Sequence, residues 1–101
     1  MEPHRVDFHP QAIKEATAAR EWYSEISDSL SIAFADELEQ AVDRIAASPG
    51  RWKQHLHDTR AVMLDRFPYL VIYRVRSGKV QIVAVQHTRR RPGYWRSRLD
   101  S

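Results

Sequence analysis

The chain has 101 residues, of which 43% are apolar and none is cysteine. This length suffices for one small domain over residues 1–101, and the lack of cysteine excludes a disulfide framework or a thiolate metal site. The net charge is unevenly spread: residues 1–50 carry 4 basic and 10 acidic side chains, whereas residues 51–101 carry 12 and 3. The basic half suits a polyanion or an acidic partner, unless the two halves neutralise each other within the fold.

The N-terminal residues contain no long apolar run that would act as a signal peptide. The longest apolar run, residues 69–73, is far shorter than the ~20 residues of a membrane helix. We therefore expect a cytoplasmic protein with no membrane partner.

A short strand and two helices are expected in the first half. Residues 5–9 alternate polar and apolar side chains, which predicts a strand with Val6 and Phe8 facing inward, and Pro10 marks a helix start. Apolar residues recur at steps of three and four over residues 11–26 and 30–47, so two helices should form an antiparallel hairpin. The predicted buried stripes contain Ile13, Ala16, Ala19, Trp22, Tyr23 and Ile26 in the first helix, and Leu30, Phe34, Leu38, Ala41 and Ile45 in the second.

The acidic residues of the second helix, Glu37 and Glu39 among them, are expected to face solvent. Residues 51–59 are polar and predict a connection without regular structure. The period then changes to two, which predicts strands over residues 60–65, 69–76 and 79–86. Ser77-Gly78 is a two-residue hairpin turn, and residues 66–68 turn the chain before it.

Three strands linked by hairpins form an antiparallel sheet, and the helix pair should cover one of its faces. The predicted fold is therefore an α+β two-layer sandwich with the element order β-α-α-β-β-β. The other face is expected to be at least partly open. Residues 92–99 can add a short C-terminal helix that packs Tyr94, Trp95 and Leu99.

The segment with the most distinctive chemistry is HTRRRPGYW, residues 87–95. Its arginines carry forked donors for phosphate or carboxylate oxygens, and its Tyr94 and Trp95 rings can stack on bases. Such a segment suits an RNA backbone or an acidic protein surface. The alternative is a solvated charge run followed by aromatic rings that pack in the core. His87 has a side-chain type suited to acid–base chemistry, although a histidine there can equally be a hydrogen-bonded structural residue.

Other chemistry is weakly indicated. Arg60, Arg66 and Arg74 either extend the basic surface or are ordinary solvated side chains. His55 and His57 have no carboxylate cluster nearby, so we expect no metal site and no cofactor. The chain has 3 glycines and no phosphate-cradling glycine-rich loop, and no G-x-S-x-G nucleophile motif occurs.

Taken in order, several stretches of the chain resemble the RelE/ParE superfamily of type II toxin–antitoxin toxins. They are VDFHP (6–10) with EWY (21–23), FADEL (34–38) with RIAASP (44–49), and RFPYLVIYRV (66–75) with HTRRRPGYW (87–95). The resemblance covers nearly the whole chain, and the superfamily has the sandwich fold expected above. It implies a growth-inhibiting toxin that forms a hetero-oligomer with a cognate antitoxin whose C-terminal segment is acidic and partly disordered.

The superfamily contains two activities. RelE-like members cleave messenger RNA on the ribosome, with basic residues on the sheet and an arginine and a tyrosine near the C-terminus. ParE-like members inhibit DNA gyrase and are not ribonucleases. This chain has apolar residues at 61–64, where the RelE-like pattern has two lysines, and Leu70 where it has an arginine. The resemblance therefore favours a non-enzymatic gyrase inhibitor over a ribosome-dependent endoribonuclease; a decayed toxin that only binds partners is a third reading.

If the chain were a ribonuclease, the resemblance would assign catalysis to Tyr94 and to Arg89 or Arg90, and His87 could replace a lost proton donor. The expected catalytic residues are then His87, Arg89 and Tyr94. For binding of the target or the antitoxin, the expected residues are Arg60, Arg66, Arg74, Arg89, Arg90, Arg91 and Trp95.

Overall fold

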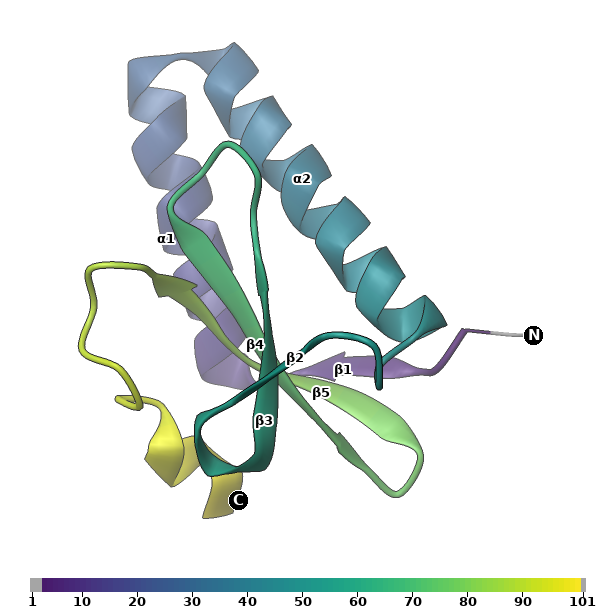
Figure 1. Ribbon diagram of the computed structural model, residues 1–101. Coiled ribbons are helices and arrows are strands. Elements are labelled where there is room, and N and C mark those ends of the chain that lie inside the picture. Colours follow the sequence, from purple (N-terminus) through teal and green to yellow (C-terminus); the bar gives the residue numbers. More distant parts are fainter. Residues whose placement is uncertain (1–2, 101) are drawn as a thin grey trace.

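A computed structural model describes residues 3–100 as two helices on a five-stranded sheet (Figure 1). The elements are β1 (Val6–Phe8), α1 (Pro10–Ile26), α2 (Asp28–Ala47), β2 (Lys53–His55), η1 (Leu56–Asp58), β3 (Thr59–Met63), β4 (Tyr69–Arg76), β5 (Lys79–His87) and η2 (Arg96–Asp100). The strand order is β1-β5-β4-β3-β2, with β1 parallel to β5 and the other pairs antiparallel. The predicted α+β sandwich is confirmed.

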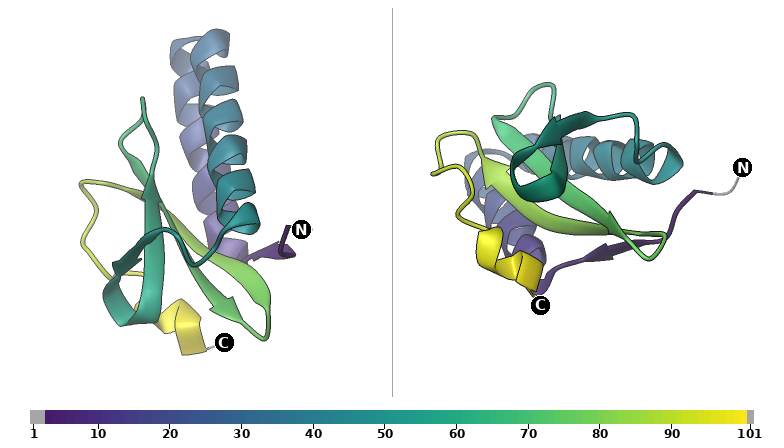
Figure 2. Two further views of the ribbon diagram at one scale, coloured as in Figure 1. Left: turned by 45° about the vertical axis from the view of Figure 1, so that its right-hand side comes forward. Right: turned by 60° about the horizontal axis from the view of Figure 1, so that its bottom comes forward.

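A single residue, Ser27, joins the two helices. Its N–H donates to the Tyr23 carbonyl at the end of α1, and its hydroxyl accepts from the Leu30 N–H (3.1 Å) at the start of α2. One serine thus satisfies backbone groups of both helix ends. The result is the predicted antiparallel hairpin, which stands along one face of the sheet (Figure 2).

The face that α1 turns toward the core agrees in part with the predicted one, since Ala16, Ala19 and Tyr23 lie in or against the core as expected. Ile13, Trp22 and Ile26 were expected to be buried but are 52%, 64% and 60% exposed. Small side chains let α1 lie close to both α2 and β5, whereas the larger apolar residues project from its flanks. The residues of α1 in or against the core are Ala12, Ala16, Ala19 and Tyr23.

Four aromatic rings form the centre of the core between the helices and the sheet. Tyr23 and Phe34 stack at 5.5 Å between ring centroids, and Phe67 and Tyr69 meet them edge-on at 4.8 to 6.5 Å. These are the favoured offset and edge-to-face arrangements of aromatic pairs. The cluster joins both helices to the β3–β4 turn.

The predicted strands are present, with one addition. Ser77 and Gly78 both have positive φ (52° and 74°), as a two-residue turn between β4 and β5 requires. The added strand is β2, which lies within residues 51–59, where no strand was expected. It is a three-residue edge strand of polar side chains, so it lacks the apolar alternation that marks the inner strands.

Glu37 was expected to face solvent, but α2 turns it toward the β3–β4 turn. Its carboxylate accepts from the Arg66 N–H (2.8 Å) and from the Arg66 Nε (3.0 Å). Burial alone would raise the pKa of Glu37, but these hydrogen bonds, together with one from the backbone of Asp65, outweigh it and lower the pKa. The carboxylate therefore fixes the turn to the helix.

The face of the sheet away from the helices is partly covered by the C-terminal segment, residues 88–100 (Figure 2). Trp95 is fully buried there against Ile72, Val83 and Ala84, with Leu99 packed alongside. The prediction that these aromatic and apolar residues pack is confirmed. The regular part of the segment is a 3-10 helix at Arg96–Asp100 rather than a helix over residues 92–99.

Candidate functional site

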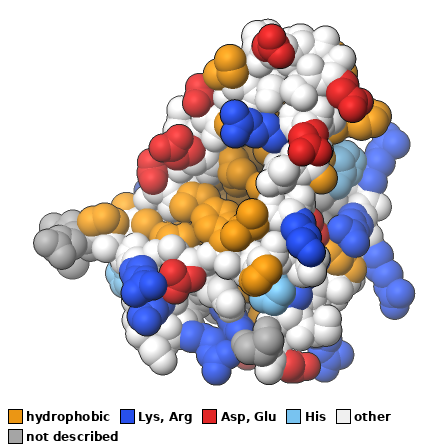
Figure 3. Space-filling view, turned by 180° about the vertical axis from the view of Figure 1, so that it is seen from behind, with side chains coloured by type: hydrophobic (Ala, Val, Ile, Leu, Met, Phe, Trp, Pro, Cys, Tyr) orange, Lys and Arg blue, Asp and Glu red, His pale blue; other side chains and the backbone are white. Residues whose placement is uncertain are grey.

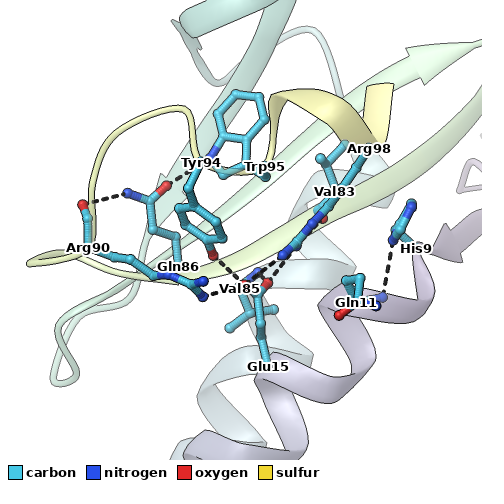
Figure 4. Close-up of polar contacts among 10 residues, drawn as sticks. All are labelled: His9, Gln11, Glu15, Val83, Val85, Gln86, Arg90, Tyr94, Trp95 and Arg98. Atoms are coloured by element: carbon cyan, nitrogen blue, oxygen red, sulfur yellow. Dashed lines mark hydrogen bonds and ion pairs between the residues drawn. The ribbon is translucent and has the colours of Figure 1, made fainter. Parts of the chain in front are cut away.

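The outer edge of β5 is only partly covered by a neighbouring strand, because β1 pairs with residues 80–82 alone. Side chains occupy the edge beyond them. Glu15 of α1 accepts from the Val85 N–H (3.1 Å), and Arg98 donates to the Val83 carbonyl (3.0 Å). Glu15 and Arg98 also pair with each other at 2.8 Å (Figure 4). The C-terminal segment is thereby fastened to both α1 and the sheet.

Glu15 is the centre of a cluster that also contains Arg90, Tyr94 and Arg98, here called the Glu15 cluster (Figure 4). Both Arg98 nitrogens reach the carboxylate, Arg90 contacts it at 3.1 Å, and the Tyr94 hydroxyl donates to it. The guanidinium of Arg90 also lies 3.7 Å from the centre of the Tyr94 ring. The Glu15 and Arg98 side chains are only 13% and 12% exposed, so a largely desolvated carboxylate holds three donor side chains in place.

Tyr94 is held as a hydrogen-bond donor. Burial raises the pKa of its hydroxyl, and the hydrogen bond to the Glu15 carboxylate raises it further, against the opposing effect of Arg90 and Arg98. A phenol ordinarily titrates near pH ~10, so this hydroxyl keeps its proton at neutral pH. Tyr94 is therefore poorly placed to transfer a proton to a substrate.

His87 ends β5 on the helix side of the sheet. Its ring meets Tyr69 edge-on, with 5.1 Å between centroids, and its Nδ1 accepts from the Arg89 N–H (3.1 Å). In the neutral imidazole this acceptor role leaves the proton on Nε2. Among the three residues expected for catalysis, the His87 ring thus accepts a hydrogen bond from the backbone N–H of Arg89, and the Tyr94 hydroxyl is directed to Glu15.

A shallow pocket of about 270 Å³ lies between α1 and the end of β5. Its charged and aromatic lining residues are Glu15, Trp22, Tyr69, His87 and Arg90. The pocket therefore brings together an exposed tryptophan, a histidine and the middle arginine of the run, Arg90.

The other arginines expected to bind a partner do not join this region. Arg60 donates to the Trp52 carbonyl (2.5 Å) on the helix side of the sheet, and Arg66 pairs with α2 at the β3–β4 turn. Arg74 lies on the far face, where it donates to the Leu99 carbonyl (2.8 Å). These three side chains help to hold the fold and lie in three separate places.

The last four residues expected to bind a partner divide into two kinds. The Arg89 and Arg91 side chains are exposed, and Arg90 is half-exposed in the Glu15 cluster. Trp95 has no exposed surface, and its Nε1 donates to the Gln86 side chain (2.9 Å). The alternative of core packing holds for Trp95, and the exposed arginines are the part of this set that a partner can reach.

The face of β3 away from the helices carries no cation. Ala61 packs toward the far face, Met63 is exposed, and Leu70 of β4 lies opposite Met63 in the register. An RNA phosphate on this strand would meet apolar side chains.

Three residues of the region were not singled out from the sequence as site residues: Glu15, Trp22 and Arg98. Glu15 lies three residues after Ala12 and four before Ala19, so it shares the buried side of α1. A buried carboxylate requires hydrogen-bond donors from elsewhere in the fold. The position of Glu15 on the buried side of α1 was therefore the sequence signal that could have identified the cluster.

An apolar groove lies between the helices on the side seen from behind (Figure 3). It encloses about 320 Å³, and Phe8, Ala16, Leu38 and Val42 are among its lining residues. A second hollow of about 530 Å³ shares Val42 with it and extends along the end of α2 to Val6. Together they form a continuous apolar trough on the outside of the helix hairpin.

Two further features concern residues 3–100. None of their helices is long and apolar enough to cross a membrane. No group of three or more histidine, cysteine, aspartate or glutamate side chains is arranged there to hold a metal ion.

A helix hairpin on a mostly antiparallel sheet whose last strand leads into a basic segment is the fold of RelE/ParE superfamily toxins. The family described as "ParE toxin of type II toxin-antitoxin system, parDE" matches residues 6–92. The chain therefore belongs to the ParE toxin family of type II toxin–antitoxin systems.

A solved structure supports the fold independently. The chain resembles a protein of the chromosomal ParDE TA system from P. aeruginosa with a TM-score of 0.74 and 15% sequence identity. The match covers 83% of this chain and 95% of the other. No curated protein matches the chain.

Proposed function

We propose that this ParE-family toxin arrests growth by binding DNA gyrase without catalysing a reaction, and that a cognate antitoxin neutralises it. The main support for binding rather than catalysis is the hydrogen bond from the Tyr94 hydroxyl to the Glu15 carboxylate. This contact commits the phenol of the basic C-terminal segment to the fold. The family assignment supplies the toxin class, and gyrase lies in the cytoplasm, where we propose the toxin acts.

Messenger RNA cleavage makes demands that this surface meets poorly. Attack of a 2′-hydroxyl on a phosphate builds negative charge, and preorganised cations that stabilise it contribute several kcal/mol, of the order of ~3 kcal/mol for each donor. Ala61 and Met63 stand on the strand where such cations would be required. Tyr94 keeps its proton, and Arg90 is paired with Glu15.

For the antitoxin we propose an amphipathic segment in the apolar trough, with an acidic stretch directed to the exposed arginines. The trough offers Phe8, Leu38 and Val42 as apolar contacts, and Arg89 and Arg91 match negative charge. A segment that is partly disordered when alone and orders on such a surface is a common mode of recognition. The expected assembly is a hetero-oligomer of toxin and antitoxin.

The decisive experiment is a supercoiling assay with purified DNA gyrase, relaxed plasmid and increasing amounts of the toxin. We expect inhibition of supercoiling, and intact transcripts in cells arrested by the toxin. Full supercoiling at saturating toxin would contradict the proposal.

One observation keeps a ribosome-dependent endoribonuclease as a second candidate. His87 is only half-buried, and it lies beside the exposed Arg89, so a proton-transfer group and a phosphate ligand are neighbours. If this candidate is right, His87→Ala and Arg89→Ala abolish cleavage of transcripts on translating ribosomes while the protein stays folded. If transcripts on translating ribosomes stay intact in the presence of wild-type toxin, the endoribonuclease candidate is excluded.

A further inference from the structure

Trp22 is the least buried tryptophan of the chain. It is 64% exposed on α1, whereas Trp52 is half-buried and Trp95 is fully buried. Ile26, one helical turn further on, is 60% exposed on the same flank of α1. Large apolar side chains that are adjacent and exposed are characteristic of protein-binding surfaces, where tryptophan is among the residues that contribute most.

The surroundings of Trp22 give this flank a second, basic component. The pocket between α1 and β5 joins Trp22 to His87 and Arg90, and residues 89–91 continue from there. Arg89 and Arg91 are exposed, and neither forms an ion pair within residues 3–100. An apolar region and a cationic region therefore adjoin on one side of the molecule.

The Glu15 cluster keeps the two regions together. Glu15 comes from the same helix as Trp22, and it holds Arg90 and Tyr94 from the C-terminal segment (Figure 4). Because Arg90 is held by Glu15 in the middle of the run, the backbone of its exposed neighbours Arg89 and Arg91 is also constrained, which lowers the entropic cost of binding through them. Preorganisation of this kind raises the affinity for a partner.

The charges near Trp22 favour a protein partner over a nucleic acid. Glu21 and Glu25 are exposed on α1 beside Trp22, and Ile26 offers no group for a phosphate or a base. A polyphosphate chain lying across Trp22 would be repelled by these carboxylates. A segment with apolar side chains at one end and acidic residues at the other would meet a complementary surface along its whole length.

We propose that the toxin binds its target protein through a surface formed by Trp22, Ile26, Arg89 and Arg91. This surface accepts a target segment in which apolar anchor residues are followed by acidic residues. The inference rests on the proposed function in that the toxin acts by binding a protein. It does not require that the protein be gyrase. The apolar part of the surface, Trp22 and Ile26, is separate from the apolar trough, which lies on the side of the helices lined by Phe8 and Val42. Arg89 and Arg91 are shared with the proposed antitoxin site, so antitoxin and target would compete for them.

Two variants test the surface, and each has a matched control. Trp22→Ala removes the apolar anchor, and Ile13→Ala removes a similarly exposed apolar residue from another flank of α1. The double variant Arg89→Glu/Arg91→Glu reverses the cationic region. Arg76→Glu reverses an exposed charge at the opposite end of the β4–β5 hairpin. Thermal unfolding of all four proteins establishes that they are folded.

The readouts are growth arrest after induced expression in bacterial cells and inhibition of purified DNA gyrase. We expect Trp22→Ala and Arg89→Glu/Arg91→Glu each to raise the toxin concentration for half-inhibition by at least about tenfold, the usual effect of losing an interface hot spot. The controls should remain within about twofold of wild type. Undiminished growth arrest and gyrase inhibition by both surface variants would overturn the proposal.

The design separates this proposal from the gyrase assignment. If wild-type toxin leaves gyrase active, and growth arrest still depends on Trp22 and the two arginines, the surface stands and the target is another protein. Wild-type toxin that neither arrests growth nor inhibits gyrase overturns both. If a single-stranded DNA or RNA oligonucleotide binds the wild-type toxin saturably, and Trp22→Ala and Arg89→Glu/Arg91→Glu lose this binding in parallel with toxicity, the surface is a nucleic-acid site. That result would overturn the proposal of an acidic target segment.

Discussion

The two faces of the sheet are covered in different ways. The helix face is filled by apolar and aromatic side chains from both helices, with Phe34 at the centre of four rings. The far face is covered by one C-terminal segment, which packs Trp95 against the sheet and is held by polar contacts, chief among them those of the Glu15 carboxylate with Arg90, Tyr94 and Arg98. Apolar packing is non-directional, whereas a polar cluster depends on the charge and position of a few atoms. The stability of the helix face should therefore depend mainly on buried volume, and that of the far face on the charge of Glu15.

The largest effect is expected from Phe34→Ala on the helix face. Phe34 is fully buried, and its removal leaves a cavity that the surrounding rings cannot fill, so the free energy of unfolding should fall by about 4 kcal/mol. Chemical denaturation followed by circular dichroism measures it. Ile32→Ala, an exposed site on the same helix, is the control and should change stability by less than ~0.5 kcal/mol. A loss for Phe34→Ala as small as the control's would break the comparison.

Glu15→Ala tests the far face and should cost about 3 kcal/mol, because it leaves Arg98 largely buried without its carboxylate. Unlike Phe34→Ala, it should act locally: the C-terminal segment should detach and become sensitive to protease while the helix hairpin keeps its amide protection. The control is Glu21→Ala, an exposed carboxylate on the same helix. Equal loss of protection in both regions would show that the faces are not independent.

Glu37→Gln sharpens the comparison, since Glu37 is a polar contact on the helix face. Arg66 is largely exposed, so solvent screening limits the loss to about 1 kcal/mol at neutral pH. Because the folded-state pKa of Glu37 is lowered, its contribution is present above the ordinary glutamate pKa and is lost as the pH falls through the folded value. The stability difference between the two proteins should thus disappear in strong acid. A difference that persists there would contradict the ion-pair explanation.

The smallest effect is expected at His9, which caps α1 by accepting from the Gln11 N–H (3.1 Å). Burial lowers the pKa of His9, and the positive charges of Arg98 and Arg74 add to this against the opposing effect of Glu15. The folded state therefore binds this proton less readily than the unfolded chain, so stability should decline as the pH drops below ~6.5.

His9→Asn is the matched variant, because asparagine caps a helix without titrating. Its stability should equal that of wild type at neutral pH and exceed it by up to ~1 kcal/mol near pH ~5. Parallel stability–pH curves for the two proteins would count against the cap.

Local patterns were sufficient for most of the fold. The helix hairpin, β4, β5 and the Ser77-Gly78 turn follow from periodicity and turn chemistry over neighbouring residues. β2 was missed because a three-residue edge strand of polar side chains has no apolar alternation. The predicted buried stripe of α1 was correct at Ala16, Ala19 and Tyr23. It wrongly included Ile13, Trp22 and Ile26, because alanine gives weaker periodicity than these larger side chains.

The polar contacts that organise the candidate site could not be predicted from local sequence patterns. Glu15 and Glu37 both lie on buried sides of amphipathic helices. From the sequence, Glu15 was not considered as a site residue, and Glu37 was predicted to face solvent. Their partners are 83 and 29 residues further along the chain. Only the tertiary fold brings Arg98 to Glu15, so the sequence indicated a basic C-terminal segment without indicating what holds it.

The pairing of β1 with β5 has a consequence for synthesis of the toxin. Val6 pairs with Val80, and the edge of β5 is completed by Glu15 with Arg98. β1 is therefore made well before residues 80–98 and must wait for them before its edge of the sheet is complete. Contacts so distant in sequence slow folding, and domains fold as units once their parts are available. The surface around Glu15 is thus unfinished until Arg98 has been made, which leaves an interval between the synthesis of β1 and the completion of the fold.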